Sequence, residues 1–400
     1  MKKYSIFTII IMLFGIIVSF VSCSGPVPEI EPESGVSIPI EETFDFAAEQ
    51  LEKTVVQIDD SERFPRFINE EGIWETLDSH AWSSGFFAGC LWFMYEHTGD
   101  DNWKIYAIKW TDSMEREQFN KENHNNGFMM FSSFGNGYLL TGDEHYREVL
   151  IESARSLASR YSDAVGFIKA NDMEQWSFPV LIDTMVNIRL LFWAAENGGD
   201  PEWGTIAETH TLNTIRDHIR ADGSTVQLID YNPSTGDIIT HDTLCGLNKD
   251  SAWARGQGQA IYGFAAAYDF TRNPAFLDAA RKVADNFIMN LPDDYVPFWD
   301  FSDPNIPDTI RDSSAASIAA AGLFELARIV PDNSENKKYN NAAVHILSSL
   351  CTNYLADRDS SNGILDHATW KKPEDPQADT SLIWGDYNFF EALMMYKKGM

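Results

Sequence analysis

Six helical segments rich in Gly, Ala, Ser and aromatic residues recur along the chain, and this repetition is the feature that most constrains the fold. Their starts are separated by 43, 57, 71, 59 and 72 residues. They begin near Trp82, Asn125, Ile182, Trp253, Asp312 and Trp384. Each interval also holds an amphipathic segment such as 275–290, whose apolar residues share one helical face.

Repetition at this period is typical of architectures built from helix pairs. Because small residues let helices approach closely, six such pairs predict an all-α fold, an (α/α)6 barrel whose inner helices are the six segments. Their N-termini are then expected to meet around one funnel. Only residues 224–229 and 237–240 favour a short β-hairpin. Four connections carry a residue expected to cap the next helix, namely Asp100, Asp143, Asp200 and Asn273.

The chain is predicted to have three parts. Residues 1–22 carry Lys2 and Lys3 before an apolar run, which is a signal-peptide pattern too short for a stable membrane span. The run ends in a sequence that resembles a bacterial lipobox, so Cys23 is expected to be lipidated; an ordinary secreted protein with a free Cys23 is the alternative. Residues 23–43, rich in Pro and Glu, favour an extended tether, and residues 44–400 a single barrel domain.

These features predict an exported lipoprotein, in the periplasm or on the outer-membrane surface, that meets the membrane only through its lipid anchor. Sixty acidic against 30 basic residues give a formal charge of −30. Such a surface repels phosphate backbones, which excludes nucleic acid as a partner. The nine histidines and four cysteines show no zinc or CxxC spacing, so neither a metal nor a cofactor is expected. Nothing in the sequence indicates the oligomeric state.

Seven blocks of sequence, in order, carry a specific resemblance. They are residues 82–87 (WSSGFF), 181–187 (LIDTMVN), 250–257 (DSAWARGQ), 297–301 (PFWDF), 306–308 (IPD), 311–316 (RDSSAA) and 384–387 (WGDY). In these blocks the chain resembles glycoside hydrolase family 88, the unsaturated glucuronyl hydrolases. The resemblance covers nearly all of residues 45–400, and it implies the same (α/α)6 barrel.

The resemblance also implies a substrate and a chemistry. The substrates are acidic oligosaccharides released by polysaccharide lyases, which end in a 4,5-unsaturated uronate. Protonation of this vinyl ether at C4 develops oxocarbenium character at C5, water adds at C5, and the hemiketal collapses to release the next sugar. One carboxyl group of raised pKa can donate the proton and then accept one from water.

Two residues take the catalytic positions. Asp183 matches the family's acid/base aspartate, and the apolar run 178–182 before it favours a raised pKa; capping of its helix is the alternative role. Asn125 stands where the family carries its second essential aspartate. Because an amide cannot supply negative charge to an oxocarbenium, Asn125 implies either a different substrate with a modified mechanism or loss of the hydration chemistry.

The remaining site positions also follow from the resemblance. They fall on Trp82, His124, Gln227, His241, Thr243, Trp253, Arg255, Gln259 and Ser381. Arg255 is expected to pair with the uronate carboxylate, or else to form a structural ion pair. Trp82 and Trp253 are expected to stack on a sugar, with a place in the core as the alternative for both and for His124. Ser381 is expected to reach a distal sugar or sulfate, and Cys245 falls on a further family position.

The expected substrate is an anion although the chain is acidic, so the funnel needs local positive charge, for which Arg255 is the candidate. A hydrolase of unsaturated uronyl oligosaccharides is the leading hypothesis. Two alternatives stay open because of Asn125: a related barrel glycosidase with another substrate, and a glycan-binding lipoprotein without turnover. A helical scaffold with no site is the fourth.

Overall fold

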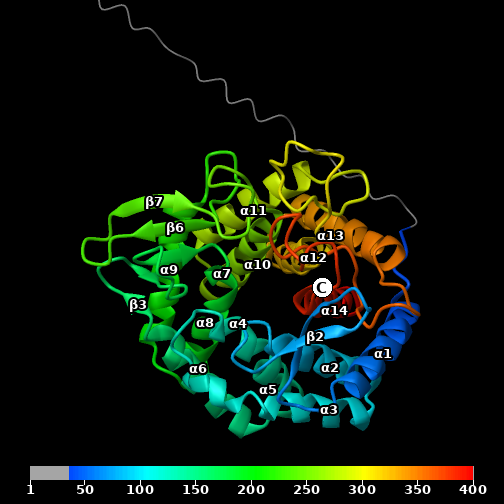
Figure 1. The fold of residues 1–400 in the computed structure, drawn as a ribbon. Helices are drawn as coiled ribbons and strands as arrows, with labels where there is room; N and C mark the ends of the chain where they lie inside the picture. The colour runs from blue at the N-terminus through cyan, green and yellow to red at the C-terminus, as the bar shows by residue number, and fades with distance from the viewer. Residues whose placement is uncertain (1–35, 400) are drawn as a thin grey trace, which may run out of the picture.

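Six inner and six outer helices form a ring in the computed structural model, which describes residues 36–399. The inner helices are α2 (Gly85–Thr98), α4 with α5 (Asn126–Met130, Asn136–Thr141), α7 with α8 (Thr184–Asn187, Arg189–Glu196), α10 (Ala254–Thr271), α12 (Ser313–Ile329) and α14 (Ile383–Lys397). The outer helices are α1 (Ile40–Gln57), α3 (Asp101–Asp112), α6 (Glu144–Ala158), α9 (Glu202–His218), α11 (Pro274–Met289) and α13 (Asn333–Asn353). The predicted (α/α)6 barrel is confirmed (Figure 1).

The starts of the outer helices follow from capping chemistry. The side chains of Asp100, Asp143 and Asn273 accept hydrogen bonds from backbone N–H groups two residues further on. Asp200 does the same for Glu202, at 3.0 Å. These bonds satisfy donors that the first turn of a helix leaves free, so the predicted caps Asp100, Asp143 and Asn273 are confirmed, whereas Pro201, the residue after Asp200, occupies the N-cap position of α9.

Small residues close the ring of inner helices. Each inner helix contacts the next, and α14 contacts α2 to complete the circle. At most of these contacts a Cβ on glycine would overlap the neighbouring helix, as between Gly127 and the carbonyl oxygen of Asn187, or Gly263 and Met185. This is the close approach that the glycine- and alanine-rich segments predict.

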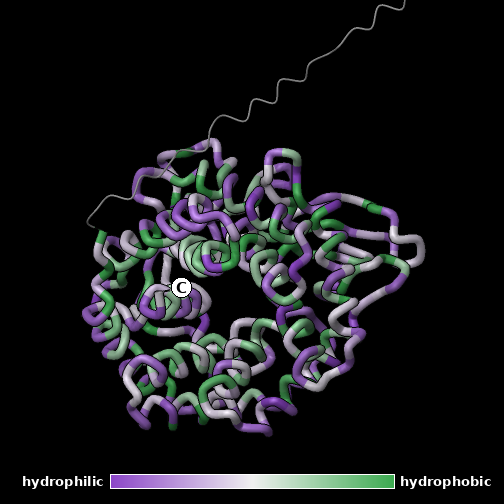
Figure 2. The backbone as a smooth tube through the Cα atoms, turned by 180° about the vertical axis from the view of Figure 1, so that it is seen from behind, coloured by the Kyte–Doolittle hydropathy of each residue, from purple (hydrophilic) through white to green (hydrophobic). Residues whose placement is uncertain are grey.

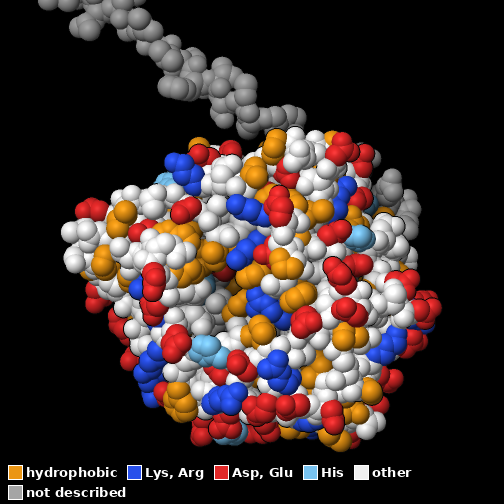
Figure 3. Space-filling view, viewed as in Figure 1, with side chains coloured by type: hydrophobic (Ala, Val, Ile, Leu, Met, Phe, Trp, Pro, Cys, Tyr) orange, Lys and Arg blue, Asp and Glu red, His pale blue; other side chains and the backbone are white. Residues whose placement is uncertain are grey.

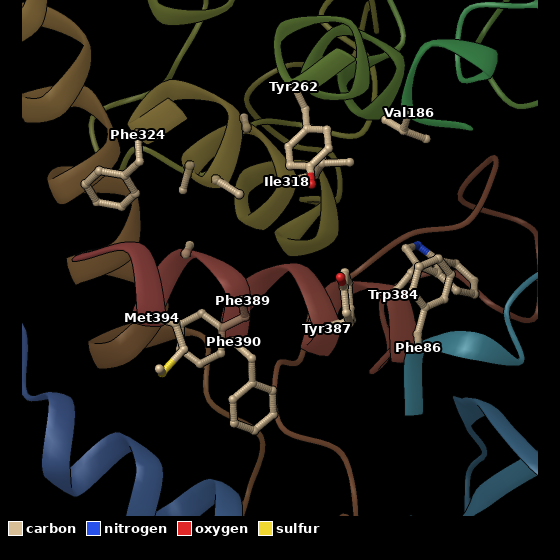
Figure 4. Close-up of a cluster of buried hydrophobic side chains, with 14 of the residues drawn as sticks. Phe86, Val186, Tyr262, Ile318, Phe324, Trp384, Tyr387, Phe389, Phe390 and Met394 are labelled. Carbon is tan, nitrogen blue, oxygen red and sulfur yellow. The ribbon is translucent and has the colours of Figure 1, made fainter. Parts of the chain in front are cut away.

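Aromatic side chains fill the space between the inner helices. In Figure 4, Tyr262 from α10 and Tyr387 from α14 point toward each other, and Trp384 lies beside Phe86. The rings of Phe86 and Tyr387 are 5.3 Å apart. This layer is buried and closes the barrel below the N-terminal ends of the inner helices.

Short hairpins and long loops lie over one face of the ring, which is the face turned to the viewer in Figure 1 and hidden in Figure 2. The strands are β1 (Phe64–Ile68) with β2 (Trp74–Leu77), β3 (Tyr161–Ser162) with β4 (Phe167–Ile168), and the sheet β5 (Pro179–Leu181), β6 (Leu228–Tyr231), β7 (Ile238–Asp242). All pairs are antiparallel. The predicted hairpin corresponds to β6 and β7, with β5 added beside β6.

Helix α1 begins at Ile40, four residues before residue 44, where the sequence places the start of the barrel domain. Proline is compatible with a helix start, and Pro39 precedes the first turn. Glu41 and Glu42 lie in that turn, where negative charge is favourable, and Phe44 is buried. The predicted signal peptide and Cys23 lie outside the described residues. No helix among residues 36–399 is long and apolar enough to cross a membrane.

Candidate active site

A cavity of about 130 Å³ opens where the N-terminal ends of the inner helices meet. Its wall includes eight of the eleven residues predicted for the site: Trp82, His124, Asn125, Asp183, Gln227, Trp253, Arg255 and Gln259. Phe86, Phe128, Asn171, Leu181, Val186, Asn187, Leu244, Cys245 and Trp370 complete the wall. The cavity is smaller than a typical ligand pocket of roughly 300–1,000 Å³, so it suits one sugar ring rather than an oligosaccharide.

Asp183 occupies the N-cap position of α7 without capping the helix. Strand β5 pairs with β6 through Leu181 and Leu228, and the chain then turns directly into α7. The carboxylate accepts no hydrogen bond from the first turn, and its Oδ1 is buried with no partner. The residue as a whole keeps some exposure, and it lines the cavity. Its side chain is therefore available to a ligand.

The surroundings of Asp183 favour its protonated form. Burial raises the pKa of Asp183 to about 6, although its own backbone N–H and the charge of Arg255 act in the opposite direction. A carboxyl group with this pKa exchanges protons near neutral pH, which is what an acid that must also act as a base requires.

Asn125 begins the neighbouring inner helix in the same way as Asp183 begins α7. It occupies the N-cap position of α4, and its side chain does not cap that helix. Its backbone N–H donates to Asn123 Oδ1 at 3.0 Å, which fixes the turn. The amide of Asn125 bonds to no described residue, and the side chain lines the cavity. Asn and Asp are strong capping residues, so two that leave their helices uncapped at one cavity indicate a functional site.

Hydrogen bonds between α4 and α7 hold these two residues in place. His124, immediately before Asn125, lies 2.8 Å through Nδ1 from the hydroxyl of Thr184, immediately after Asp183. One turn further along, the amide of Asn187 accepts from the backbone N–H of Phe128 at 2.7 Å. The same amide donates to the carbonyl of Asp183 at 3.0 Å.

Arg255 makes more structural contacts than the sequence indicates. Its Nε lies 3.6 Å from Asp312 Oδ2, and both side chains are buried. Its guanidinium also donates to the carbonyl oxygens of Thr369 and Trp370 and lies 4.7 Å from the ring of Trp253. Arg255 therefore forms the structural ion pair given above as its alternative role. Asp312 partly balances the positive charge that Arg255 offers to a ligand.

Two further cations lie beside the cavity, and neither was predicted from the sequence. The Arg66 guanidinium lies 4.6 Å from the ring of Trp370 and 5.6 Å from that of Trp82. Burial lowers the pKa of Arg66 to about 10, so it stays charged at neutral pH. Lys371 Nζ lies 3.9 Å from the Trp370 ring. Neither cation forms an ion pair with a described residue.

These cations give the face that carries the cavity a charge pattern of its own. Figure 3 shows Lys and Arg side chains among hydrophobic ones near the centre of this face, and acidic side chains mainly around its edge. The local positive charge that an anionic ligand needs is therefore present, although Arg255 supplies only part of it. No sequence signal marks Arg66 or Trp370, because one lies on a short strand and the other in an irregular segment.

Gln227 lines the cavity but uses its side-chain oxygen to hold a loop. The Oε1 atom accepts from the hydroxyl of Thr243 and from the backbone N–H groups of Leu244 and Cys245, the last two both at 2.8 Å. This arrangement brings Cys245 to the cavity. Burial raises the pKa of the Cys245 thiol to about 11, so the thiol is protonated at neutral pH.

Three predicted positions do not line this cavity. His241 is exposed on β7, where its backbone pairs with Ile229. The hydroxyl of Thr243 donates to Gln227 and so helps to hold the loop beside the cavity. Ser381 is 1% exposed and packs against Gly363. A role of these three residues toward a ligand stays a prediction.

The other predicted wall residues keep free polar atoms. Gln259 Oε1, Trp253 Nε1 and His124 Nε2 are all buried without a hydrogen-bond partner. Trp82 packs on Trp384, with ring centroids 4.6 Å apart, and is partly buried. No cluster of three or more His, Cys, Asp or Glu side chains among residues 36–399 is arranged to hold a metal ion.

Comparison with known proteins gives a consistent result. Residues 48–375 match the family described as Glycosyl Hydrolase Family 88. An unsaturated glucuronyl hydrolase of Formosa agariphila is 40% identical over 324 residues, which are 79% of this chain and 80% of that protein. An unsaturated chondroitin disaccharide hydrolase of Streptococcus pneumoniae is 31% identical over 380 residues, or 92% of this chain and 96% of that protein.

Solved structures agree with the sequence comparison. The crystal structure of an unsaturated glucuronyl hydrolase specific for heparin superposes with a TM-score of 0.85 at 35% identity, covering 90% of this chain and 97% of that one. The unsaturated glucuronyl hydrolase of Bacillus sp. GL1, responsible for the degradation of glycosaminoglycan, gives the same TM-score of 0.85 at 29% identity over the same shares.

Proposed function

The chain belongs to glycosyl hydrolase family 88 and is a glycoside hydrolase of unsaturated uronyl oligosaccharides, and we propose that Asp183 supplies and then recovers the proton of the reaction. One observation carries this proposal. A carboxyl group at the start of an inner helix faces the cavity, leaves its helix uncapped and has a buried oxygen without a partner.

The reaction proceeds in two proton transfers. The protonated carboxyl of Asp183 gives its proton to C4 of the vinyl ether, which forms a C4–H bond and leaves oxocarbenium character at C5. The resulting carboxylate takes a proton from water as the water oxygen bonds to C5. The hemiketal then opens and the next sugar leaves as an alcohol. Asp183 ends protonated, ready for another turnover.

Asn125 serves this mechanism as a neutral partner. Its free amide is placed to hold a substrate hydroxyl or the attacking water, but it carries no charge to stabilise the oxocarbenium. Because a second carboxylate would also raise the pKa of Asp183, its absence leaves burial as the main cause of the raised value. We therefore propose that the family chemistry is kept, with a weaker electrostatic contribution from this position.

The anionic end of the substrate is proposed to lie toward the cations. Arg255 lines the cavity, and Arg66 and Lys371 flank its tryptophans. A uronate at this position interacts favourably with these three cations, because few of the described carboxylates form ion pairs with them.

The direct test is loss of absorbance at the vinyl-ether band when the protein is incubated with unsaturated disaccharides. Glycosaminoglycan, ulvan and pectin lyase products should be compared, because the chain does not indicate which polysaccharide it serves. At least one of them is expected to be consumed by the wild type and to survive Asp183→Asn. If every product stays intact with the wild type, a binding role without turnover replaces the proposal.

We further propose that the enzyme is exported and anchored by a lipid on Cys23. The supporting features are the charged and apolar pattern of residues 1–22, the lipobox-like sequence at Cys23 and the Pro- and Glu-rich segment after it. Fractionation of cells that express the full chain should place it with membranes. Cys23→Ser should move it to the soluble fraction, and an unchanged membrane fraction in that variant would contradict the anchor.

A further inference from the structure

The imidazole of His124 has one hydrogen bond and one free nitrogen. The side chain is fully buried and lines the active-site cavity, immediately before Asn125. Its Nδ1 lies 2.8 Å from the hydroxyl of Thr184, while its Nε2 has no partner. A buried polar atom without a partner is costly, so an unpaired nitrogen at a ligand cavity is best explained by a bond to the ligand.

His124 is neutral at the pH at which such an enzyme works. Burial, with a contribution from the nearby charge of Arg160, lowers its pKa to about 3. A neutral imidazole carries a proton on one nitrogen and a lone pair on the other. What Nε2 offers to a ligand therefore depends on which nitrogen holds the proton.

The hydroxyl of Thr184 decides between the two forms. Its only hydrogen-bond partner among the described residues is His124 Nδ1. If Nδ1 carried the proton and donated it to Thr184, both the Thr184 O–H and the Nε2 lone pair would be left unpaired. If Thr184 donates to Nδ1, only the Nε2–H remains unpaired. The second arrangement leaves fewer buried groups unsatisfied and is favoured.

We propose that Thr184 is a positioning residue: its hydroxyl holds His124 in the Nε2–H form, and that N–H donates to an oxygen of the bound substrate. The proposal rests on the proposed function, since it names a contact within the same site. It assigns to Thr184, which is fully buried and does not line the active-site cavity, an effect on catalysis that acts only through His124.

The experiment combines a tautomer measurement with kinetics. Protein labelled with ¹⁵N-histidine is examined by NMR without substrate, and the His124 signals are identified by their loss in His124→Gln. The wild type is expected to show a protonated Nε2 and an unprotonated Nδ1. In Thr184→Val, which keeps the shape but removes the hydroxyl, this pattern is expected to give way to a mixture of tautomers.

The kinetic effect should follow the tautomer. In Thr184→Val, kcat/KM on an unsaturated disaccharide is expected to fall by about three- to tenfold, the usual effect of losing one hydrogen bond. Thr184→Ser keeps a hydroxyl and should restore both the NMR pattern and the rate. The dependence of the rate on the ionisation of Asp183 should be unchanged in both variants, because neither alters that carboxyl.

A matched control separates this effect from a general loss of stability. Thr211 is also fully buried on a helix, and its hydroxyl donates to the Ala207 carbonyl at 2.7 Å, away from the cavity. Thr211→Val should leave the His124 signals and kcat/KM as they are.

Either of two results would overturn the proposal: a wild-type spectrum with the proton on Nδ1, or a Thr184→Val variant with unchanged kcat/KM. Absence of turnover by the wild type would contradict the proposed function instead, and the NMR pattern would still report on the tautomer.

Discussion

Two aspartates begin inner helices of the barrel, Asp312 fully buried and Asp183 partly exposed, and they differ in almost everything else. Asp312 caps α12: its Oδ1 accepts from the backbone N–H groups of Ser314 and Ala315 at 3.0 and 3.2 Å, and from that of Thr369 at 3.2 Å. Its Oδ2 faces Arg255. Asp183 begins α7 and makes none of these contacts. The same residue type in the same kind of position is structural in one helix and reactive in the other.

The difference shows what a capping position can be used for. At Asp312 the helix N-terminus, a loop and a guanidinium all engage the carboxylate, so its protonation state matters to the fold. At Asp183 the fold leaves the carboxylate free, and burial raises its pKa to about 6. Helix starts that meet around a barrel mouth can therefore hold either a structural anchor or an acid, and the hydrogen bonds distinguish the two.

The largest effect is expected on activity at Asp183. Asp183→Asn keeps the size of the side chain but cannot donate and recover a proton, so kcat should fall by about 10³-fold, as is usual for loss of a general acid. Turnover of an unsaturated disaccharide measures it. Substrate binding, followed by calorimetry, should change little. A variant that keeps more than a tenth of wild-type kcat would place the proton donor elsewhere.

The next effect is on stability at Asp312. Asp312→Ala leaves the Arg255 charge without its partner and removes the cap of α12, so the free energy of unfolding should fall by about 3 kcal/mol. Urea denaturation measures it. Asp143→Ala, which removes an exposed cap of α6, is the control and should cost clearly less. Equal losses in the two variants would show that the buried contacts of Asp312 add nothing.

Asp183→Asn should have the opposite effect on stability. The pKa of Asp183 is raised from 3.8 to about 6 in the folded protein, so the wild type loses stability as pH rises from about 4 to about 6, where the unfolded chain has lost this proton and the folded protein still holds it. At pH 7 the variant should be about 3 kcal/mol more stable than the wild type. Below about pH 4 the two should be equal. Urea denaturation at both values tests this, and a variant less stable at pH 7 would indicate a structural carboxylate.

The smallest effect is expected at Asn125. Asn125→Asp places a second carboxylate at the cavity, which should raise the pKa of Asp183 and add stabilisation of the oxocarbenium. We expect kcat/KM on unsaturated uronyl disaccharides at pH 7 to rise by about tenfold. Asn123→Asp, on the same turn but outside the cavity wall, serves as the control. If Asn125→Asp instead loses activity on every unsaturated disaccharide, the neutral amide belongs to a different substrate.

Much of the fold was predictable because its causes are local. Glycine- and alanine-rich segments predict helices that touch closely, and Asp100 and Asn273 mark helix starts by chemistry that acts within one turn. Asp183 and Asn125 were assigned to the site from the family resemblance, and the expected convergence of inner-helix N-termini agrees with that assignment.

The rest of the site depends on contacts between distant segments. Arg66 lies beside the cavity on the hairpin between α1 and α2, and Trp370 reaches the cavity from an irregular segment near the end of the chain. His241 and Ser381, on a strand and in a loop, do not line the cavity, and segments between helices have no helical period from which their position could be derived. The ion pair between Arg255 and Asp312 likewise depends on the packing of α10 against α12, so neither segment of sequence predicts it alone.

The pH dependence of kcat/KM for an unsaturated disaccharide tests the central claim most directly. Among other groups at the cavity, His124 has a pKa of about 3 and Cys245 one of about 11, so neither titrates between pH 4 and 8. Glu391, with a pKa of about 7, lies outside the cavity wall, and Glu391→Gln should leave the profile unchanged. The account predicts that kcat/KM falls as pH rises above about 6, where Asp183 loses its proton. A rate that is constant or rises from pH 5 to 8 would contradict it.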